Sequence, residues 1–156
     1  MSRPPPAARA EAAPGTDPAA SRVPGLTDCR DRVAVVTGAS SGIGAQLARD
    51  LAGRGMRVVL VARRYDRLQA LAGELGDERV LPLACDVGER GDVERMIERA
   101  AAHWKRLDLV VNAAGYNNHV LFKDHDVEDV ERMMRVNYLG VVWAIKAALP
   151  HMRARH

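Results

Sequence analysis

Apolar and polar positions alternate along the chain in two distinct periods from Arg32 onward. Short apolar runs, bounded by polar or glycine-containing turns, are typical of strands that are buried on both faces of a parallel sheet. Such runs predict four strands, at Val33–Thr37, Arg57–Ala62, Val80–Ala84 and Leu107–Ala113.

The segments between these runs have a helical period instead. Apolar residues recur there at every third or fourth position, which predicts amphipathic helices at about Gly42–Arg54, Asp66–Leu75 and Asp92–Trp104. The clearest apolar stripe lies in the last of these and consists of Val93, Met96, Ile97, Ala100, Ala101 and Trp104. We interpret this stripe as a surface that packs in the core.

A polar loop, Tyr116–His125, follows the fourth predicted strand and leads into a long helical stretch from about Val127 to Met152. Asp126 is a plausible N-cap for this helix. His125 and Asp126 could form an acid/base pair, but their place beside a helix start favours a surface residue and a cap. We expect one apolar face of the last helix to lack cover, namely Val136, Leu139, Val142 and Trp143.

Strands that alternate with helices indicate βαβ units, and hence an α/β fold built on a doubly wound parallel sheet. Sheets of this order usually continue with strands on the other side of the first strand, where the ligand crevice forms. This sequence stops on a helix instead. We therefore expect a sheet that is truncated after the fourth strand and the long helix that follows it, in a domain over residues 29–156 that is incomplete at its C-terminus.

The first 28 residues differ from the rest in composition. Six of the eight prolines lie there among alanines, with almost no large apolar side chain to bury. Such a segment cannot offset the entropy lost on ordering, so we expect residues 1–28 to form a disordered tail. An organelle transit peptide is the alternative, and Glu11, Asp17 and the prolines count against it.

Composition narrows the classes of function. The 156 residues, 47% of them hydrophobic, suffice for one compact domain. The net charge of +3 arises from acidic and basic residues that are interleaved along the chain, which disfavours a nucleic-acid partner. No apolar stretch reaches the roughly 18 residues that a membrane span needs. Because Cys29 and Cys85 match neither a zinc-binding nor a disulfide spacing, we expect reduced thiols, a cytoplasmic location and no metal.

A glycine-rich segment, Thr37–Gly44, joins the first predicted strand to the first predicted helix. Its glycines let the backbone turn sharply and approach a pyrophosphate, while the helix N-terminus presents free N–H groups to the phosphate charge. A tight connection without a ligand is the alternative, although the position directly after the first strand favours a phosphate cradle. The candidate cofactor-binding residues here are Gly38, Ser40, Ser41, Gly42, Ile43 and Gly44.

Two arginines, Arg63 and Arg64, follow the second predicted strand, where a dinucleotide fold meets the adenosine ribose. An acidic residue at this point would bind the ribose 2′-OH of NAD, whereas guanidinium groups suit the 2′-phosphate of NADP. The pair therefore favours NADP over NAD. Solvated cations at the start of a helix are the alternative interpretation.

Two further motifs follow the third and fourth predicted strands. Asp86 and Val87 come after the third strand, and an aspartate there accepts a hydrogen bond from an adenine amino group or caps the following helix. The sequence does not decide between these roles. Small residues follow at the tip of the fourth strand, where bulk would obstruct a cofactor but where close backbone packing also needs them: Asn112, Ala113, Ala114 and Gly115.

Together, the glycine-rich segment, the Asp-Val pair, Asn-Ala-Ala-Gly and Val136–Gly140 resemble the short-chain dehydrogenase/reductase family over about residues 31–152. The resemblance implies a Rossmann-type fold and a 2′-phosphate contact from Arg63. It also implies cofactor contacts from Gly38, Ser40, Ile43, Asp86, Val87, Asn112 and Ala114. Ala113 departs from the family's more frequent Asn-Asn-Ala-Gly, a variation that should not remove binding.

The resemblance also implies a catalytic role for Asn137, which would hold a water at the end of a proton relay through a local distortion of its helix. The other relay members in the family are a serine, a tyrosine and a lysine, the last two in Tyr-x-x-x-Lys. The positions four residues after the three tyrosines are Gln69, Val120 and Val142, so this sequence lacks that motif.

Our hypothesis is an NADP-dependent oxidoreductase that acts on a small carbonyl or alcohol compound. Catalysis by this chain alone is uncertain, because the remaining relay residues would follow His156. A non-catalytic dinucleotide-binding module, or one completed by a partner, is the alternative. The last helix resembles the one through which family members often dimerise, which suggests a homo-oligomer.

Overall fold

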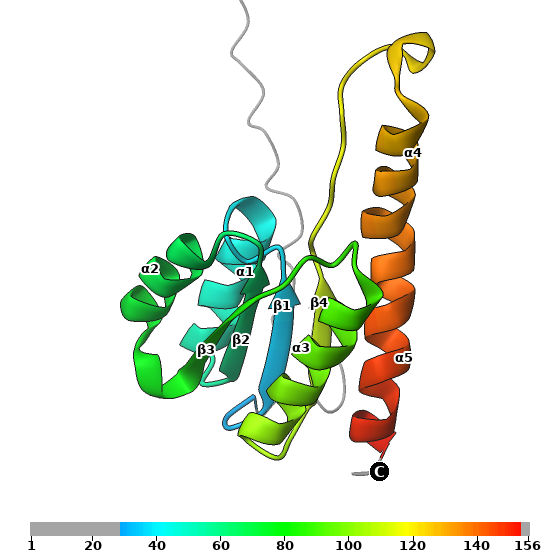
Figure 1. Ribbon diagram of the computed structural model, residues 1–156. Coiled ribbons are helices and arrows are strands. Elements are labelled where there is room, and N and C mark those ends of the chain that lie inside the picture. Colours follow the sequence, from blue (N-terminus) through cyan, green and yellow to red (C-terminus); the bar gives the residue numbers. More distant parts are fainter. Residues whose placement is uncertain (1–28, 154–156) are drawn as a thin grey trace, which may run out of the picture.

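Four parallel strands form the centre of the molecule (Figure 1). The computed structural model describes residues 29–153, so the tail expected over residues 1–28 lies outside the described residues. The strands are β1 (Val33–Thr37), β2 (Arg57–Ala62), β3 (Val80–Ala84) and β4 (Leu109–Asn112). Their order in the sheet is β3-β2-β1-β4, with every neighbouring pair parallel. The predicted parallel α/β architecture is confirmed.

Helices cover both faces of this sheet, with α1 (Gly42–Gly53) and α2 (Tyr65–Leu75) on one face and α3 (Arg90–His103) and α5 (Gly140–Arg153) on the other. A further helix, α4 (Val127–Met134), extends the α5 column beyond the sheet (Figure 1). Short 3₁₀ turns are η1 (Asp77–Arg79) and η2 (Phe122–Asp124). Successive side chains of a strand point to opposite faces. Ala34 and Val36 of β1 accordingly pack with α1 and α2, while Val33 and Val35 pack with α3 and α5. The apolar stripe of α3 lies in this second cluster, as predicted.

Two predicted boundaries differ from the observed ones. β4 spans Leu109–Asn112 rather than Leu107–Ala113. Leu107 is fully buried in the core cluster under α3 but precedes the strand ladder, because an apolar run records burial and not strand pairing. The first turn of α3 begins at Arg90 instead of Asp92, since its polar residues carry no apolar signal.

The long helical stretch predicted after β4 is a single column with an altered middle (Figure 1). Between α4 and α5, residues Arg135–Leu139 form a π-helical segment, η3, whose wider turn re-aims the side chains that follow it. The expectation that Val136, Leu139, Val142 and Trp143 form an uncovered apolar face is wrong. Val136 is buried, and Trp143 packs against the core cluster beside α3. The exposed apolar residues of this column are instead Val127, Met134, Tyr138, Ile145 and Leu149.

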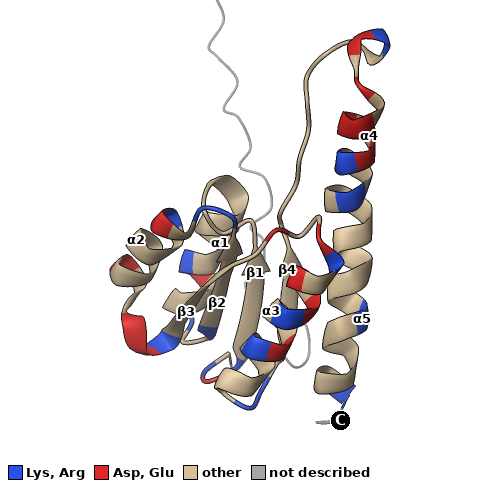
Figure 2. Ribbon diagram, in the orientation of Figure 1, with Lys and Arg blue, Asp and Glu red and all other residues tan. Residues whose placement is uncertain are grey.

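Charged side chains of both signs are interspersed over α2, α3 and α4, whereas α5 is mostly uncharged (Figure 2). No helix in the described part of the chain is long and apolar enough to cross a membrane.

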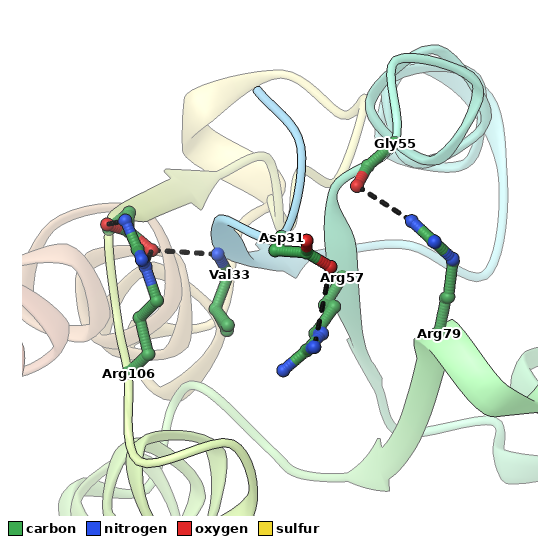
Figure 3. A network of polar contacts seen from close by, with 7 residues as sticks. Asp31, Val33, Gly55, Arg57, Arg79 and Arg106 are labelled. Carbon is green, nitrogen blue, oxygen red and sulfur yellow. Dashed lines mark hydrogen bonds and ion pairs between the residues drawn. The ribbon is translucent and has the colours of Figure 1, made fainter. Parts of the chain in front are cut away.

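A polar network fixes the amino ends of the strands (Figure 3). The carboxylate of Asp108 accepts the backbone N–H of Val33 at 2.8 Å and is paired with the guanidinium of Arg106 at 2.5 and 2.8 Å. The Asp108 N–H donates in turn to the Val33 carbonyl at 2.9 Å. Beside it, Arg57 of β2 donates to Asp31 at 3.4 Å. These contacts hold the end of the sheet opposite to the candidate site.

Candidate functional site

A cavity of about 310 Å³ opens at the carboxyl ends of the strands. It is lined by Gly38, Ser40, Ser41, Ile43, Gly44, Ala62, Arg63, Arg64, Cys85, Asp86, Val87, Ala113, Ala114, Gly115, Tyr116 and Val136. Of the candidate cofactor-binding residues, only Gly42 and Asn112 do not line it. Segments that follow all four strands therefore meet at one concave surface, which is where ligands bind in open parallel sheets.

The glycine-rich segment packs so closely that side chains are excluded at two positions. A Cβ on Gly38, whose φ is +70°, would lie 2.7 Å from the carbonyl oxygen of Ala113. A Cβ on Gly44 would lie 2.5 Å from the carbonyl oxygen of Gly38. Gly42 has a φ of +56° with open space around it, so backbone conformation alone favours glycine there. The loop thus brings bare backbone and the first turn of α1 to the cavity.

The tip of β4 is tied to β1 by the Thr37 side chain. Its hydroxyl donates to the carbonyl of Val111 at 3.3 Å and accepts the N–H of Ala114 at 3.1 Å. Thr37 is buried, and this pairing satisfies its hydroxyl. The small residues after β4 therefore lie against the glycine loop, as the sequence predicted.

Arg64 connects the start of α2 to the glycine loop. Its Nη2 donates to the hydroxyl oxygens of Ser40 at 3.2 Å and of Ser41 at 3.3 Å. Arg63 lines the same cavity. Since β2 ends on Ala62, these two guanidinium groups and two hydroxyls make the rim of the cavity rich in donors at that point.

The segment after β3 has a local structural role. Oδ1 of Asp86 accepts the N–H of Gly88 at 2.9 Å, and the N–H of Asp86 donates to Asp92 of α3 at 3.3 Å. A Cβ on Gly140 would lie 2.6 Å from the carbonyl oxygen of Val87, so the start of α5 packs directly on this segment. Asp86 is thus oriented by a turn of its own while it lines the cavity.

Cys85 is a buried thiol that lines the cavity. Burial, together with the smaller effect of the negative charges of Asp92 and Asp86, raises its pKa to about 12. The side chain is therefore a neutral thiol near pH 7, and a neutral thiol is a poor nucleophile.

Asn137 lies in the π-helical segment η3, and its side chain grips the backbone of Tyr116. Oδ1 accepts the Tyr116 N–H and Nδ2 donates to the Tyr116 carbonyl, each at 2.8 Å. The local distortion expected for this helix is present. Asn137 itself does not line the cavity, but it fixes a residue that does.

A second group of polar contacts was not predicted. Asp129 of α4 accepts hydrogen bonds from the Tyr116 hydroxyl at 2.5 Å and from the Asn118 amide at 2.8 Å, and it lies 3.3 Å from Nδ1 of His125. The Tyr116 bond is the main cause of a raised Tyr116 pKa and a lowered Asp129 pKa. The sequence periodicity predicted that Asp129 lies near the helix start, but it did not predict these hydrogen bonds to the loop.

Two expectations at this helix start need correction. The His125 side chain is only 9% exposed and pairs with Asp129, so it is not a surface residue. Asp126 occupies the N-cap position, but its side chain makes no capping hydrogen bond; its backbone carbonyl accepts the N–H groups of Asp129 and Val130. The carboxylate that bonds to the loop is that of Asp129, three residues after the N-cap position.

Known proteins are similar to this chain in sequence. A family model described as short chain dehydrogenase matches residues 32–156. The 11-beta-hydroxysteroid dehydrogenase of Pinus massoniana is 40% identical over 133 residues, which cover 83% of this chain and 37% of that protein. An uncharacterized oxidoreductase of Staphylococcus aureus is 38% identical over 127 residues, which cover 81% of this chain and 55% of that protein.

Solved structures share the fold. The 3-ketoacyl-(acyl-carrier-protein) reductase from Brucella melitensis, complexed with NADH, matches with a TM-score of 0.78 at 31% identity, over 81% of this chain and 52% of that one. The L-sorbose reductase from Gluconobacter frateurii, complexed with NADPH and L-sorbose, matches with a TM-score of 0.77 at 33% identity, over 81% and 49%. The chain spans about half, or less, of the length of these proteins.

Proposed function

This chain belongs to the short-chain dehydrogenase family, and we propose that it binds NADP(H) as part of an oxidoreductase that acts on a small carbonyl or alcohol compound. The bound nicotinamide would supply or accept the hydride. The residues of the chain would hold and orient the dinucleotide at the carboxyl ends of the strands.

The residues that line the cavity suit a dinucleotide. Bare backbone at Gly38 and Gly44 leaves room for a pyrophosphate beside the first turn of α1, where free N–H groups and the helix dipole attract phosphate charge. Asp86 and Val87 lie after β3, where an adenine would rest. The tip of β4 lies on the other side of the glycine loop, toward the nicotinamide half.

The contacts of Arg64 carry the preference for NADP. Its guanidinium is held at the cavity rim by Ser40 and Ser41, and the end of β2 offers no carboxylate for a ribose 2′-OH. A guanidinium retains its charge at all working pH values and pairs with phosphate oxygens through parallel hydrogen bonds. Arg63, beside it, provides a second cation. We therefore assign the 2′-phosphate to both arginines, with Arg64 as the preorganised one.

Calorimetric titration with NADPH and NADH tests this assignment. We expect the chain to bind NADPH more tightly than NADH. Arg64→Ala should weaken the affinity for NADPH by about tenfold or more, whereas the affinity for NADH should change little. Arg67→Ala removes an exposed arginine of the same helix that does not line the cavity, and serves as the control. Equal affinities for the two dinucleotides would refute the preference, and no binding of either would refute the function.

The catalytic half of the reaction is proposed from the family alone. Asn137 would take the place that the family gives to its relay asparagine, while the relay serine and Tyr-x-x-x-Lys would come from sequence beyond His156. Reading the coding DNA downstream of His156 tests this. A stop codon there would instead favour a dinucleotide-binding module without chemistry of its own.

A homo-oligomer and a cytoplasmic location complete the proposal. Ile145 and Leu149 are exposed apolar side chains four residues apart in α5, which places them on one face of that helix, and Met134 and Tyr138 are exposed earlier in the column. Sedimentation equilibrium tests the oligomer: Ile145→Lys should shift the chain toward monomer. Subcellular fractionation tests the location.

A further inference from the structure

Three residues of the β4–α4 loop contact one carboxylate. Asp129, in the first turn of α4, is bonded to Tyr116 at the start of the loop, to Asn118 next to it and to His125 at its end. Its side chain is 17% exposed, so these contacts are partly shielded from water. Both ends of the loop therefore converge on a single residue of the helix.

The middle of the loop contributes little packing of its own. Val120, Leu121 and Phe122 are 45%, 67% and 84% exposed. In Figure 1 this segment rises from β4 alongside α4 and turns at the far end of the helical column. The polar contacts at the two ends, and not burial of the tip, thus define where the loop lies.

Tyr116 is the one large residue among the four residues of the loop that line the cavity, the others being Ala113, Ala114 and Gly115. Asn137 holds its backbone through two hydrogen bonds, Asp129 holds its hydroxyl, and the guanidinium of Arg132 lies 5.1 Å from the centre of its ring. The ring is therefore fixed from α4, and Tyr116 is among the residues that line the cavity. Because its hydroxyl donates to Asp129, Tyr116 serves as a wall and not as a proton donor to a ligand.

The position of this wall in the sheet determines which part of a dinucleotide it faces. Arg63 and Arg64 follow β2, on one side of the glycine loop, whereas Tyr116 follows β4 on the other. A dinucleotide whose pyrophosphate lies at α1 and whose adenosine lies over β2 extends its second half across β4. Tyr116 thus borders the nicotinamide half of the site.

We infer that Asp129 is a positioning residue for the nicotinamide half of the cofactor site, acting through the β4–α4 loop and Tyr116. The inference rests on the proposed function, since it assumes that a dinucleotide occupies the cavity. Without the Asp129 carboxylate, the Tyr116 hydroxyl, Asn118 and His125 lose their shared partner and the loop beyond Tyr116 is released, although Asn137 still holds the Tyr116 backbone. The adenosine half of the site, built on β2, β3 and α1, remains.

Limited proteolysis tests the loop without any ligand. Lys123 lies in the exposed part of the loop and offers a trypsin cleavage site. We expect Asp129→Ala to accelerate cleavage after Lys123 by about tenfold or more, as local opening becomes more frequent. Glu128→Ala is the matched control, because it removes the neighbouring carboxylate from the same first turn, with the same change of charge and helix-dipole interaction, but without loop contacts.

Calorimetry with two probes tests the role in the site. NADPH spans the whole cavity, whereas adenosine 2′,5′-bisphosphate carries only the adenosine half. We expect Asp129→Ala to weaken the affinity for NADPH by about tenfold and to leave the affinity for the bisphosphate within about twofold of the wild-type value. A general loss of folding would lower both affinities alike. Asp129→Asn keeps an oxygen acceptor for Tyr116 and should restore part of the NADPH affinity. Adding Tyr116→Phe to Asp129→Ala should cause no further loss of NADPH affinity in the double variant.

The outcomes separate the two proposals. If the wild-type chain binds neither probe, the proposed function fails and the inference fails with it. If it binds both, then equal losses for the two probes, no loss for NADPH, or an unchanged rate of cleavage after Lys123 would each overturn the role of Asp129 while the proposed function stands.

Discussion

The side-chain amide of Asn137 forms a closed pair of hydrogen bonds with the backbone of Tyr116, accepting its N–H and donating to its carbonyl, each at 2.8 Å. The two residues are 21 positions apart, and the pairing joins the middle of the α4–α5 column to the first residue after Gly115. The asparagine of the π-helical segment therefore has a structural function in this chain, beside any place in a proton relay.

Asn137→Leu should release this grip. The N–H and carbonyl of Tyr116 would lose their partners, at a cost of about 1–2 kcal/mol of unfolding free energy. Hydrogen exchange monitored by NMR should show that the Tyr116 amide exchanges about tenfold faster than in the wild type. The Val59 amide, in the centre of the sheet, should change only as much as the global free energy of unfolding does. Asn117→Ala, in the adjoining loop, is the control; an unchanged Tyr116 amide would contradict the prediction.

Gly38→Ala should destabilise the chain more than Gly42→Ala. Both positions have positive φ, which costs an alanine about 1–2 kcal/mol. At Gly38 the new methyl group would also lie 2.7 Å from the Ala113 carbonyl oxygen, which adds about 1–3 kcal/mol of overpacking. Urea unfolding curves measure both, and Gly42→Ala is the internal control because open space surrounds it. Equal costs would show that the β4 tip yields freely.

Asp108→Ala should destabilise the sheet without affecting the cavity. It removes the acceptor of the Val33 N–H and the partner of Arg106, a loss of about 1–3 kcal/mol for an unsatisfied amide. Because the network lies at the opposite end of the strands, NADPH affinity should stay unchanged in the folded fraction. Glu74→Ala breaks an exposed ion pair with Arg49 and should have little effect on unfolding. A loss of affinity in Asp108→Ala would contradict the separation of the two ends.

Alkaline pH should destabilise the chain through Cys85. The folded pKa of about 12 lies above the ordinary thiol value, so the unfolded chain releases the proton first as pH rises. Stability from this group is therefore full below about pH 8.5 and falls toward pH 12, by at most about 1.4 kcal/mol per pH unit. Between pH 7 and 10, the free energy of unfolding should decrease less steeply with pH in Cys85→Ala than in the wild type. Parallel slopes would show that the thiol titrates normally.

The sequence alone determined the features that depend on local stereochemistry. The apolar runs located all four strands and the helical periods located the helices between them, because β1 and β2 are buried on both faces, β3 and β4 are partly buried, and each of these helices buries one face. The glycine-rich segment and the residues after each strand predicted most of the cavity lining, since parallel strands bring their carboxyl ends to one edge.

Only the tertiary structure decided the contacts between elements. In the structure, Arg64 donates hydrogen bonds to Ser40 and Ser41. Val136 and Trp143, which the periodicity predicted to be uncovered, pack in the core. Tyr116, Asn118 and His125 all contact Asp129. These pairings depend on how loops and helices are oriented in space, and an aspartate at a helix start has the same local signature whether it faces water or three hydrogen-bond donors. Periodicity reports which face of an element is buried, and a polar contact across a loop leaves no period in the sequence.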